Sequence, residues 1–143
     1  MLVGIDHIGI AVRNLDEAIR VYVDALGAET SKTHRFSEAQ MQVSMLSVGG
    51  TTIELMSPVG AEGIIAKFIQ RHGEGIHHIC FEVDDIDKEL SRLSAKGVKL
   101  IDEIARPGLD GMVAFIHPKA MNGVLIELVQ KTQSSTFNKT EAK

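Results

Sequence analysis

Two histidines and two glutamates occupy matching positions in an internal repeat of this sequence. His7 begins the apolar run "HIGIAV", and His78 begins the run "HICFEV" 71 residues later. Glu54 lies in "GTTIEL", and Glu127 lies in "GVLIEL" 73 residues further along the chain. Imidazole nitrogens and carboxylate oxygens are ligands that divalent transition metals accept together. If the two copies of the repeat lie side by side, these four side chains predict one metal site with mixed nitrogen and oxygen ligands.

The alternation of side chains along a strand indicates which face carries the histidines. Neighbouring residues of a strand point to opposite faces of the sheet. In the first run we expect Ile8 to pack under a helix. His7 then lies on the opposite face of the sheet, beside the small residue Gly9. The same register places His78 on the cleft side. It separates His78 from His77, which falls on the helix side or near the start of the strand.

Each candidate residue has an ordinary explanation when it is taken alone. A single strand histidine is more often a core or surface residue than a ligand, and Glu54 alone would more often be solvated. Glu127 lies in the middle of an apolar strand, where a buried carboxylate needs a partner or a metal. The matched positions of all four residues favour the metal site over these separate explanations.

The segments that position these residues repeat as well. Each copy reads as a strand, a helix and further strands, so that each module is close to βαβββ. Apolar residues at helical spacing predict the helices, with Asn14 as an N-cap and Gly27 and Gly97 as terminating residues. The predicted helices cover 14–27, 64–73 and 85–97, and the predicted strands cover 7–12, 39–50, 51–58, 77–83, 98–104, 112–118 and 123–130.

Length and charge restrict the classes of function. The 143 residues suit one domain, with module one over about 1–60, a linker helix over about 61–73, module two over about 74–131 and a polar tail over 132–143. With a net charge of −4 and no basic stripe, we expect no nucleic-acid partner. No apolar run approaches the ~20 residues that span a bilayer, so we expect no membrane partner. We see no targeting segment, and the single cysteine, Cys80, fits a reducing compartment, so we expect a cytoplasmic protein.

Longer strings of the sequence carry a resemblance to a known family. "DHIGIAV…GTTIEL" and "HHICFEV…GVLIELVQ" resemble the vicinal oxygen chelate superfamily, also called glyoxalase I-like. Within it, "GEGIHHICFEVDDI" and "HPK…GVLIELVQ" are more similar to the methylmalonyl-CoA epimerase family, and the resemblance covers residues 5–130. It implies an α+β fold in which two tandem βαβββ modules form a cupped mixed sheet around one metal site. It also implies a homodimer that acts on an acyl-CoA thioester.

The resemblance further implies a role for each candidate residue. One divalent metal per chain, with Co²⁺ expected first and Ni²⁺, Mn²⁺ or Zn²⁺ as alternatives, would be bound by four ligands: His7, Glu54, His78 and Glu127. Some epimerases carry Gln at the position of Glu54, so this chain keeps an oxygen ligand there and adds a negative charge. Epimerases also have a catalytic glutamate after the first helix, and here "FSEAQMQV" offers Glu38.

The implied reaction is the interconversion of (R)- and (S)-methylmalonyl-CoA. The C2 proton of this substrate lies between a thioester carbonyl and a carboxylate. A metal bound to both oxygens would stabilise the enolate that forms when the proton leaves. Inversion needs a base on one face of C2 and an acid on the other, and the two exchange roles with direction. We expect Glu38 and Glu127 in these two roles.

Other functions stay open from the sequence. A glyoxalase I-type enzyme would use a similar metal site on a thiol hemithioacetal. An extradiol dioxygenase would need two histidines and one carboxylate with open positions, which Glu54 would crowd. A metal-free small-molecule-binding protein of the same fold would commonly lack the ligand set that this chain retains.

Overall fold

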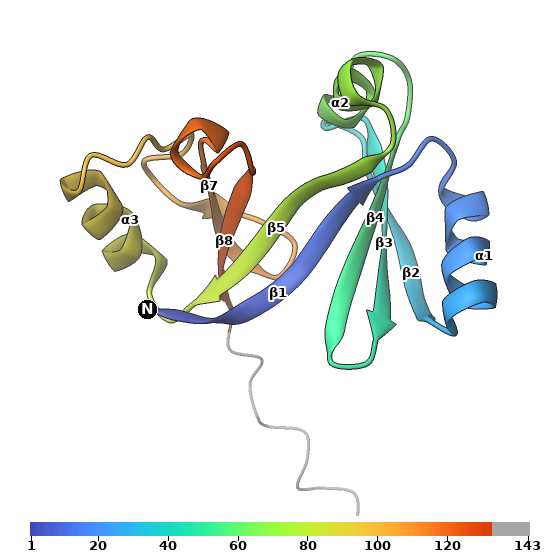
Figure 1. Ribbon diagram of the computed structural model, residues 1–143, viewed down its shortest axis with the longest axis horizontal. Helices are drawn as coiled ribbons and strands as arrows, with labels where there is room; N and C mark the ends of the chain where they lie inside the picture. Colours follow the sequence, from blue (N-terminus) through green and yellow to red (C-terminus); the bar gives the residue numbers. More distant parts are fainter. Residues whose placement is uncertain (133–143) are drawn as a thin grey trace, which may run out of the picture.

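The first strands of the two sequence repeats lie side by side at the centre of the fold. The structure is a computed structural model that describes residues 1–132 (Figure 1). In it, β1 (Leu2–Ala11) pairs antiparallel with β5 (Gly75–Val83). On their other edges, β1 pairs parallel with β4 (Thr51–Pro58), and β5 pairs parallel with β8 (Ile126–Lys131). The two repeats therefore join through equivalent strands.

The remaining elements lie on both sides of this central pair. They are, within the described residues, α1 (Leu15–Leu26), β2 (Glu29–Phe36), β3 (Met41–Val48), α2 (Ile64–His72), α3 (Ile86–Ala95), β6 (Arg106–Pro107), β7 (Gly111–Ile116) and a 3₁₀ turn (Pro118–Ala120). The strand order is β2-β3-β4-β1-β5-β8-β7-β6, so each repeat contributes four consecutive strands. This topology confirms the predicted α+β fold with two βαβββ modules in one cupped mixed sheet. The residue boundaries of the modules stay a prediction.

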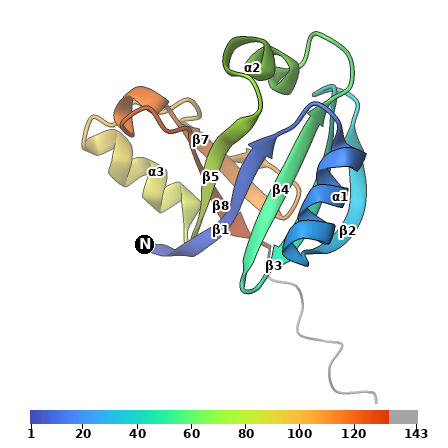
Figure 2. The same ribbon diagram turned by 45° about the vertical axis from the view of Figure 1, so that its right-hand side comes forward.

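Local signals in the sequence explain where the helices begin and end. The side chain of Asn14 accepts the backbone N–H of Glu17 at the start of α1, and Gly27 ends this helix in a left-handed conformation. Asp85 caps α3 in the same way as Asn14 caps α1. Figure 2 shows α1 and α3 against the two halves of the sheet and α2 near the end of β1 and the start of β5.

Two of the core clusters lie between the sheet and the helices α1 and α3. Under α1 lie Val12, Leu15, Ala28, Leu46 and Leu55. Under α3 lie Val83, Ile86, Leu90, Leu93, Ala114, Ile116, Ile126 and Leu128. Because strand side chains alternate, burying these residues under the helices directs the neighbouring strand residues to the concave face of the sheet.

The strand predicted over 98–104 is wrong. Leu100 forms only an isolated bridge with Ile116, and the edge strand β6 begins after this segment. Asp102 explains the difference, because its carboxylate accepts the backbone N–H of Phe115 at 2.8 Å and so replaces a backbone partner. Conversely, the sequence pattern did not locate β2. Seven of its eight residues are exposed, so it shows no apolar alternation.

Two further expectations concern the ends of the chain and the membrane. Among the helices of the described part of the chain, none is long and apolar enough to cross a bilayer. The polar tail predicted over 132–143 lies outside the described residues, apart from Thr132.

Candidate metal centre

The four central strands bring the predicted ligands together on the concave face of the sheet. The strands β1, β4, β5 and β8 contribute, in this order, His7, Glu54, His78 and Glu127. The Nε2 atoms of His7 and His78 lie 3.0 Å apart. Oε2 of Glu127 lies 3.3 Å from Nε2 of His7 and 3.0 Å from Nε2 of His78. Oε2 of Glu54 lies 3.4 Å from Nε2 of His7. All four side chains are thus within reach of one central point.

These spacings fit neighbouring ligands of one divalent ion. Two ligand atoms that bind a metal at right angles, each at ~2.1 Å, lie about 3.0 Å apart. His7, Glu54 and His78 each offer one ligand atom, and these atoms lie within 4.8 Å of one another. The carboxylate of Glu127 lies beside them in the same largely buried site. Two such carboxylates repel each other away from water, so a cation between them is favoured. The donor set therefore fits a divalent metal, and the ligand role of each residue stays a prediction.

Burial and hydrogen bonds shift the pKa values of these groups in different directions. Burial raises the pKa of Glu54, and the two histidines offset this only in part. Burial acts on Glu127 too, but its hydrogen bonds with both histidines outweigh burial and lower the pKa of Glu127. Burial opposes a charge on His7, yet its hydrogen bonds, first of all to Asp6, raise the pKa of His7 far above 6.5. In the metal-free site a proton on His7 therefore supplies positive charge between the carboxylates.

A β-bulge in β1 and another in β5 place a second polar side chain beside each histidine. The register of β1 against β5 shifts at three places, and two of these shifts make Asp6 an extra residue in β1 and His77 an extra residue in β5. A bulge redirects side chains in this way. Oδ2 of Asp6 lies 2.7 Å from Nδ1 of His7, and Nδ1 of His77 lies 3.0 Å from Nδ1 of His78. Each bulge residue therefore holds the Nδ1 side of the next histidine and leaves Nε2 facing the central point.

The prediction that the strand register separates His77 from His78 is wrong. Because of the bulge, both residues line the same cleft. Burial, followed by the nearby His78, lowers the pKa of His77 to about 4. A neutral ring has one nitrogen that can accept a hydrogen bond, and Nδ1 of His77 lies within hydrogen-bond distance of Nδ1 of His78. The ring of His77 also packs edge-on against Phe68 of α2, with 4.8 Å between ring centres.

Gly9 leaves the space that the ring of His78 occupies. The two residues are paired directly across β1 and β5. A Cβ atom at position 9 would lie 2.8 Å from Nε2 of His78 and closer still to Cε1 and Nδ1. This agrees with the expectation that small residues beside the histidines make room for them.

Cys80 belongs to the packing around the site. It is fully buried and clusters with Val113 and Val129. Together with Asp6 and His7 it forms a second group of potential ligands. Burial raises the pKa of the Cys80 thiol to about 12, which disfavours the thiolate that binds metals. The group that contains Glu54 and His78 is therefore the stronger candidate.

A cleft of about 770 Å³ opens onto the candidate site. Glu54, His78 and Glu127 line it, and so does Glu38. Glu38 is exposed in the turn between β2 and β3, a position from which a carboxylate reaches the cleft. The structure thus brings Glu38 to the same cavity as the candidate ligands, and its catalytic role stays a prediction.

The sequence patterns did not identify several residues that lie around the site. Arg106 lines the cleft beside Phe115, with its guanidinium carbon 5.5 Å from the ring centre and its Nε 3.4 Å from Asp102. No pattern in the sequence indicated this group. Asp6 and His77 directly precede the two histidines, 71 residues apart, and this match in the repeat was a signal that could have identified them.

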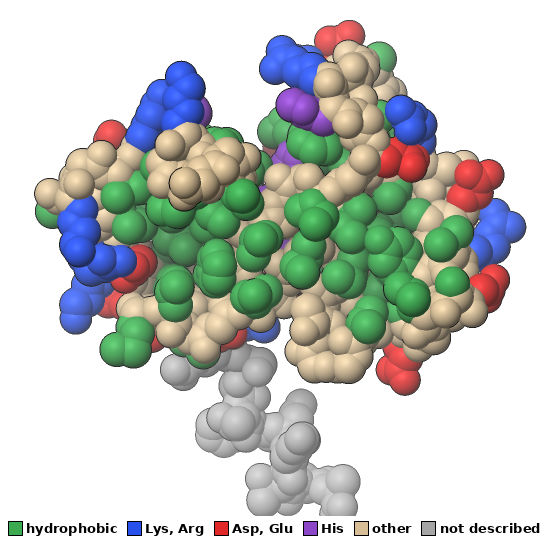
Figure 3. Space-filling view, viewed as in Figure 1, with side chains coloured by type: hydrophobic (Ala, Val, Ile, Leu, Met, Phe, Trp, Pro, Cys, Tyr) green, Lys and Arg blue, Asp and Glu red, His purple; other side chains and the backbone are tan. Residues whose placement is uncertain are grey.

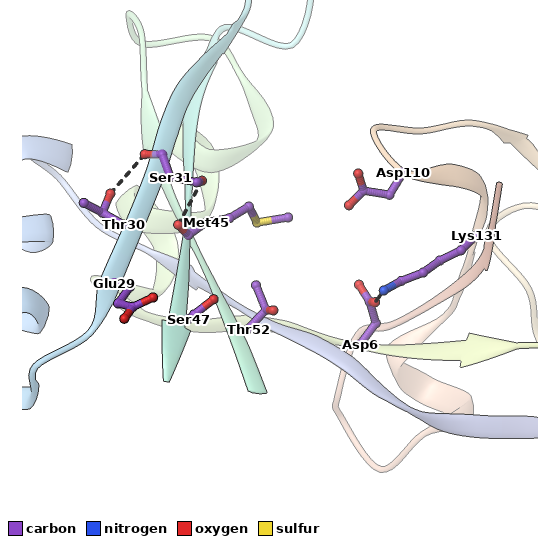
Figure 4. Close-up of a pocket in the computed structure, with 9 residues that line it drawn as sticks. All are labelled: Asp6, Glu29, Thr30, Ser31, Met45, Ser47, Thr52, Asp110 and Lys131. Carbon is purple, nitrogen blue, oxygen red and sulfur yellow. Dashed lines mark hydrogen bonds and ion pairs between the residues drawn. The ribbon is translucent and has the colours of Figure 1, made fainter. Parts of the chain in front are cut away.

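A second pocket of about 300 Å³ lies beside Asp6 and shares no lining residue with the cleft (Figure 4). Its walls include serine and threonine hydroxyls from β2, β3 and β4. Figure 4 shows Lys131 reaching across to Asp6, whose Oδ1 lies 2.7 Å from the ammonium Nζ. Asp6 therefore connects this pocket with His7.

Known proteins resemble this chain over most of its length. Residues 6–115 match the model of the Glyoxalase/Bleomycin resistance protein/Dioxygenase superfamily. A mitochondrial methylmalonyl-CoA epimerase of Dictyostelium discoideum is 39% identical over 129 residues, which cover 89% of this chain and 78% of that protein. The structure of methylmalonyl-CoA epimerase from Mycobacterium tuberculosis superposes with a TM-score of 0.85 at 40% identity, covering 92% of this chain and 89% of that chain. A Streptomyces coelicolor methylmalonyl-CoA epimerase variant in complex with 2-nitronate-propionyl-CoA superposes with a TM-score of 0.84 at 33% identity, covering 92% and 99%.

Proposed function

This chain belongs to the glyoxalase/bleomycin resistance protein/dioxygenase superfamily and, within it, to the methylmalonyl-CoA epimerases, and we propose how its residues carry out the reaction. The reaction interconverts (R)- and (S)-methylmalonyl-CoA by removing the C2 proton and returning a proton to the other face. In our proposal Glu38 and Glu127 move this proton. One divalent metal is held by His7, Glu54, His78 and Glu127.

The observation that carries the proposal is the meeting of two imidazoles and two carboxylates at the cleft. The two Nε2 atoms and the carboxylates of Glu54 and Glu127 lie within 3.0–3.9 Å of neighbouring members of the group. Glu38 lines the same cleft from a different element, the turn before β3. A cleft with a charged floor and a separate carboxylate at its edge suits proton transfer on two faces of one carbon.

In our proposal the residues of the site have roles in metal binding and in proton transfer. When bound, a divalent ion supplies Lewis-acid stabilisation of the negative charge that develops as C2 loses its proton. The hydrogen bonds with both histidines lower the pKa of Glu127, which keeps its carboxylate ionised but makes it a weaker base, so in our proposal the acidity of C2 comes from the bound ion. Glu38 approaches from the edge of the cleft. Each glutamate removes the proton on its own face, and the other returns one, so that C2 inverts.

The test is α-proton exchange started from each pure C2 epimer. The Co²⁺-loaded protein is incubated in D₂O with one epimer, and deuterium at C2 and formation of the other epimer are followed with and without EDTA. We expect both in the wild-type protein without EDTA. Glu38→Gln should keep its metal and lose epimer formation. It should still exchange deuterium from the one epimer whose proton Glu127 removes.

A matched control and the contrary outcomes make the test decisive. Glu17→Gln removes a carboxylate from an exposed site on α1 and should behave as the wild-type protein. Full epimer formation by Glu38→Gln would refute the role of Glu38. A wild-type protein that binds metal but exchanges no proton would point instead to a glyoxalase I-type substrate. A protein that neither binds metal nor exchanges would be a binding protein of this fold.

We propose Co²⁺ as the native ion, with Ni²⁺, Mn²⁺ and Zn²⁺ as alternatives. Two imidazoles and two carboxylates are borderline donors that all these ions accept. Four protein ligands leave room on a six-coordinate ion for two further oxygen donors. Reconstituting the metal-free protein with each ion and comparing kcat/KM separates the alternatives. Equal activity with all four would remove the preference for Co²⁺.

We also propose that the protein is a homodimer. Four large apolar side chains of β1 and β5 are more than half exposed: Leu2, Val3, Ile5 and Ile76. Figure 3 shows apolar side chains gathered over the face that these strands cross between α3 and α1. Contiguous apolar surface of this kind marks interfaces. Light scattering should give twice the mass of the chain, and Ile5→Glu should lower it. A monomeric wild-type protein would refute the proposal.

A further inference from the structure

We infer that Lys131 is a positioning residue of the metal centre and that it acts on His7 through Asp6, from the second pocket. The inference rests on the proposed function only in taking His7 as a metal ligand. No part of it depends on the substrate or on the roles of Glu38 and Glu127.

The contacts form an unbroken chain from the pocket to the centre. Nζ of Lys131 lies 2.7 Å from Oδ1 of Asp6, and Oδ2 of the same carboxylate lies 2.7 Å from Nδ1 of His7. A carboxylate held at both oxygens is not free to rotate about its bond to Cβ. Because Nδ1–H of His7 donates to Asp6, the orientation of Asp6 sets the plane of the imidazole ring. The direction of Nε2 toward the other ligands follows from that plane.

Burial makes the ammonium group necessary for this arrangement. The side chain of Asp6 is only 9% exposed, whereas that of Lys131 is 47% exposed at the pocket. A buried carboxylate that loses its cation is strongly destabilised and moves toward water when it can. The pocket offers such water-accessible space beside Asp6 (Figure 4). Without Lys131, we therefore expect Asp6 to turn toward the pocket and to lose its hydrogen bond with Nδ1 of His7.

In the second repeat, the residue beside the histidine is held in place without a charged partner. His77 occupies the bulge position that corresponds to Asp6, and its ring is held by packing on Phe68. An apolar contact fixes His77, so His78 needs no cation behind its partner. Lys131 is therefore specific to the His7 side of the centre.

The direction of the effect separates positioning from simple charge. An ammonium near a bound dication repels it, so through-space charge alone predicts tighter metal binding after Lys131 is neutralised. Positioning through Asp6 predicts weaker binding. The two explanations therefore give opposite signs in one measurement.

The experiment measures Co²⁺ binding, without turnover, by competition with a chelator, and records the visible absorption spectrum of the bound ion. Asp6→Asn should weaken binding by about 10–100-fold, the usual effect of losing the partner of a ligating histidine. Lys131→Met should weaken it by about tenfold and alter the spectrum, and Lys131→Gln should do the same. Lys131→Arg, which keeps the cation, should restore both. Lys88→Met, an exposed lysine of α3, is the charge-matched control and should bind as the wild-type protein.

The double variant decides whether Lys131 acts through Asp6. Asp6→Asn combined with Lys131→Met should bind Co²⁺ no more weakly than Asp6→Asn alone, because the pathway is already broken. Additive losses would overturn the inference, and so would unchanged or tighter binding in Lys131→Met. A wild-type protein that binds no Co²⁺ would instead contradict the proposed metal centre, which is a different result.

Discussion

Replacing Gly9 by alanine tests whether the ring of His78 must lie where the structure places it. Gly9 faces His78 across the β1–β5 pair. Its backbone does not adopt the left-handed conformation that favours glycine, so alanine fits the main chain. The substitution therefore adds one methyl group to the floor beneath the ring and changes nothing else directly.

The expected magnitude follows from the space available. The new Cβ would lie 2.8 Å from Nε2 of His78, whereas non-bonded heavy atoms prefer about 3.5 Å or more. The ring must therefore withdraw by at least about 0.7 Å, while metal–ligand distances tolerate only about 0.2 Å. Losing His78 as a ligand should weaken Co²⁺ binding by at least about 100-fold. The overpacking itself should lower the free energy of unfolding by about 1–3 kcal/mol.

The assay is competition for Co²⁺ with a chelator of known affinity, with thermal unfolding measured alongside. Gly4→Ala is the matched control, because it lies in the same strand and an added Cβ would meet no atom within 4 Å. It should bind Co²⁺ as tightly as the wild-type protein. If Gly9→Ala binds Co²⁺ within about twofold of the wild-type value with an unchanged spectrum, the placement of His78 as a ligand is wrong.

Three further predictions follow from the same structure. Because the pKa of His7 is raised, the metal must displace a proton from this residue. The association constant for Co²⁺ should therefore increase by about tenfold per pH unit from about pH 6 to pH 8. An association constant that does not change with pH would contradict this. His77→Phe keeps the packing on Phe68 but removes the nitrogen beside His78, and should weaken Co²⁺ binding by about 10–100-fold in the chelator assay. Leu46→Ala should lower the free energy of unfolding by about 2–5 kcal/mol in urea titration, because Leu46 is fully buried, whereas Val48→Ala at the exposed end of the same strand should change it by less than about 0.5 kcal/mol.

Local patterns were sufficient to predict much of the scaffold. Asn14 and Gly27 mark the ends of α1 because capping depends on residues adjacent in the chain. Strand alternation placed His7 and His78 on the face away from the helices, since that alternation is a property of a single strand. The internal repeat predicted a sheet built from two modules, and the strand order confirms it.

The errors lie where pairing between distant segments decides the local structure. The bulges at Asp6 and His77 arise from the register of two strands that are far apart in the sequence, so neither strand alone reveals them. Asp102 replaces a strand partner for β7, and this contact exists only once β7 lies beside it. The exposed strand β2 is held by its backbone pairing with β3. The side chains of β2 show no pattern that would predict this pairing.

The sequence by itself predicted four candidate ligands and the strand face that carries each of them, because residue type and alternation are local properties. Only the tertiary structure decided that the Nε2 atoms of His7 and His78 meet at 3.0 Å, that Glu38 reaches their cleft, and that a cation supports Asp6 from a separate pocket. The reason is physical: these relations depend on the register and curvature of a sheet whose strands come from both ends of the chain. They are set by the packing of the whole domain, which no short stretch of sequence contains.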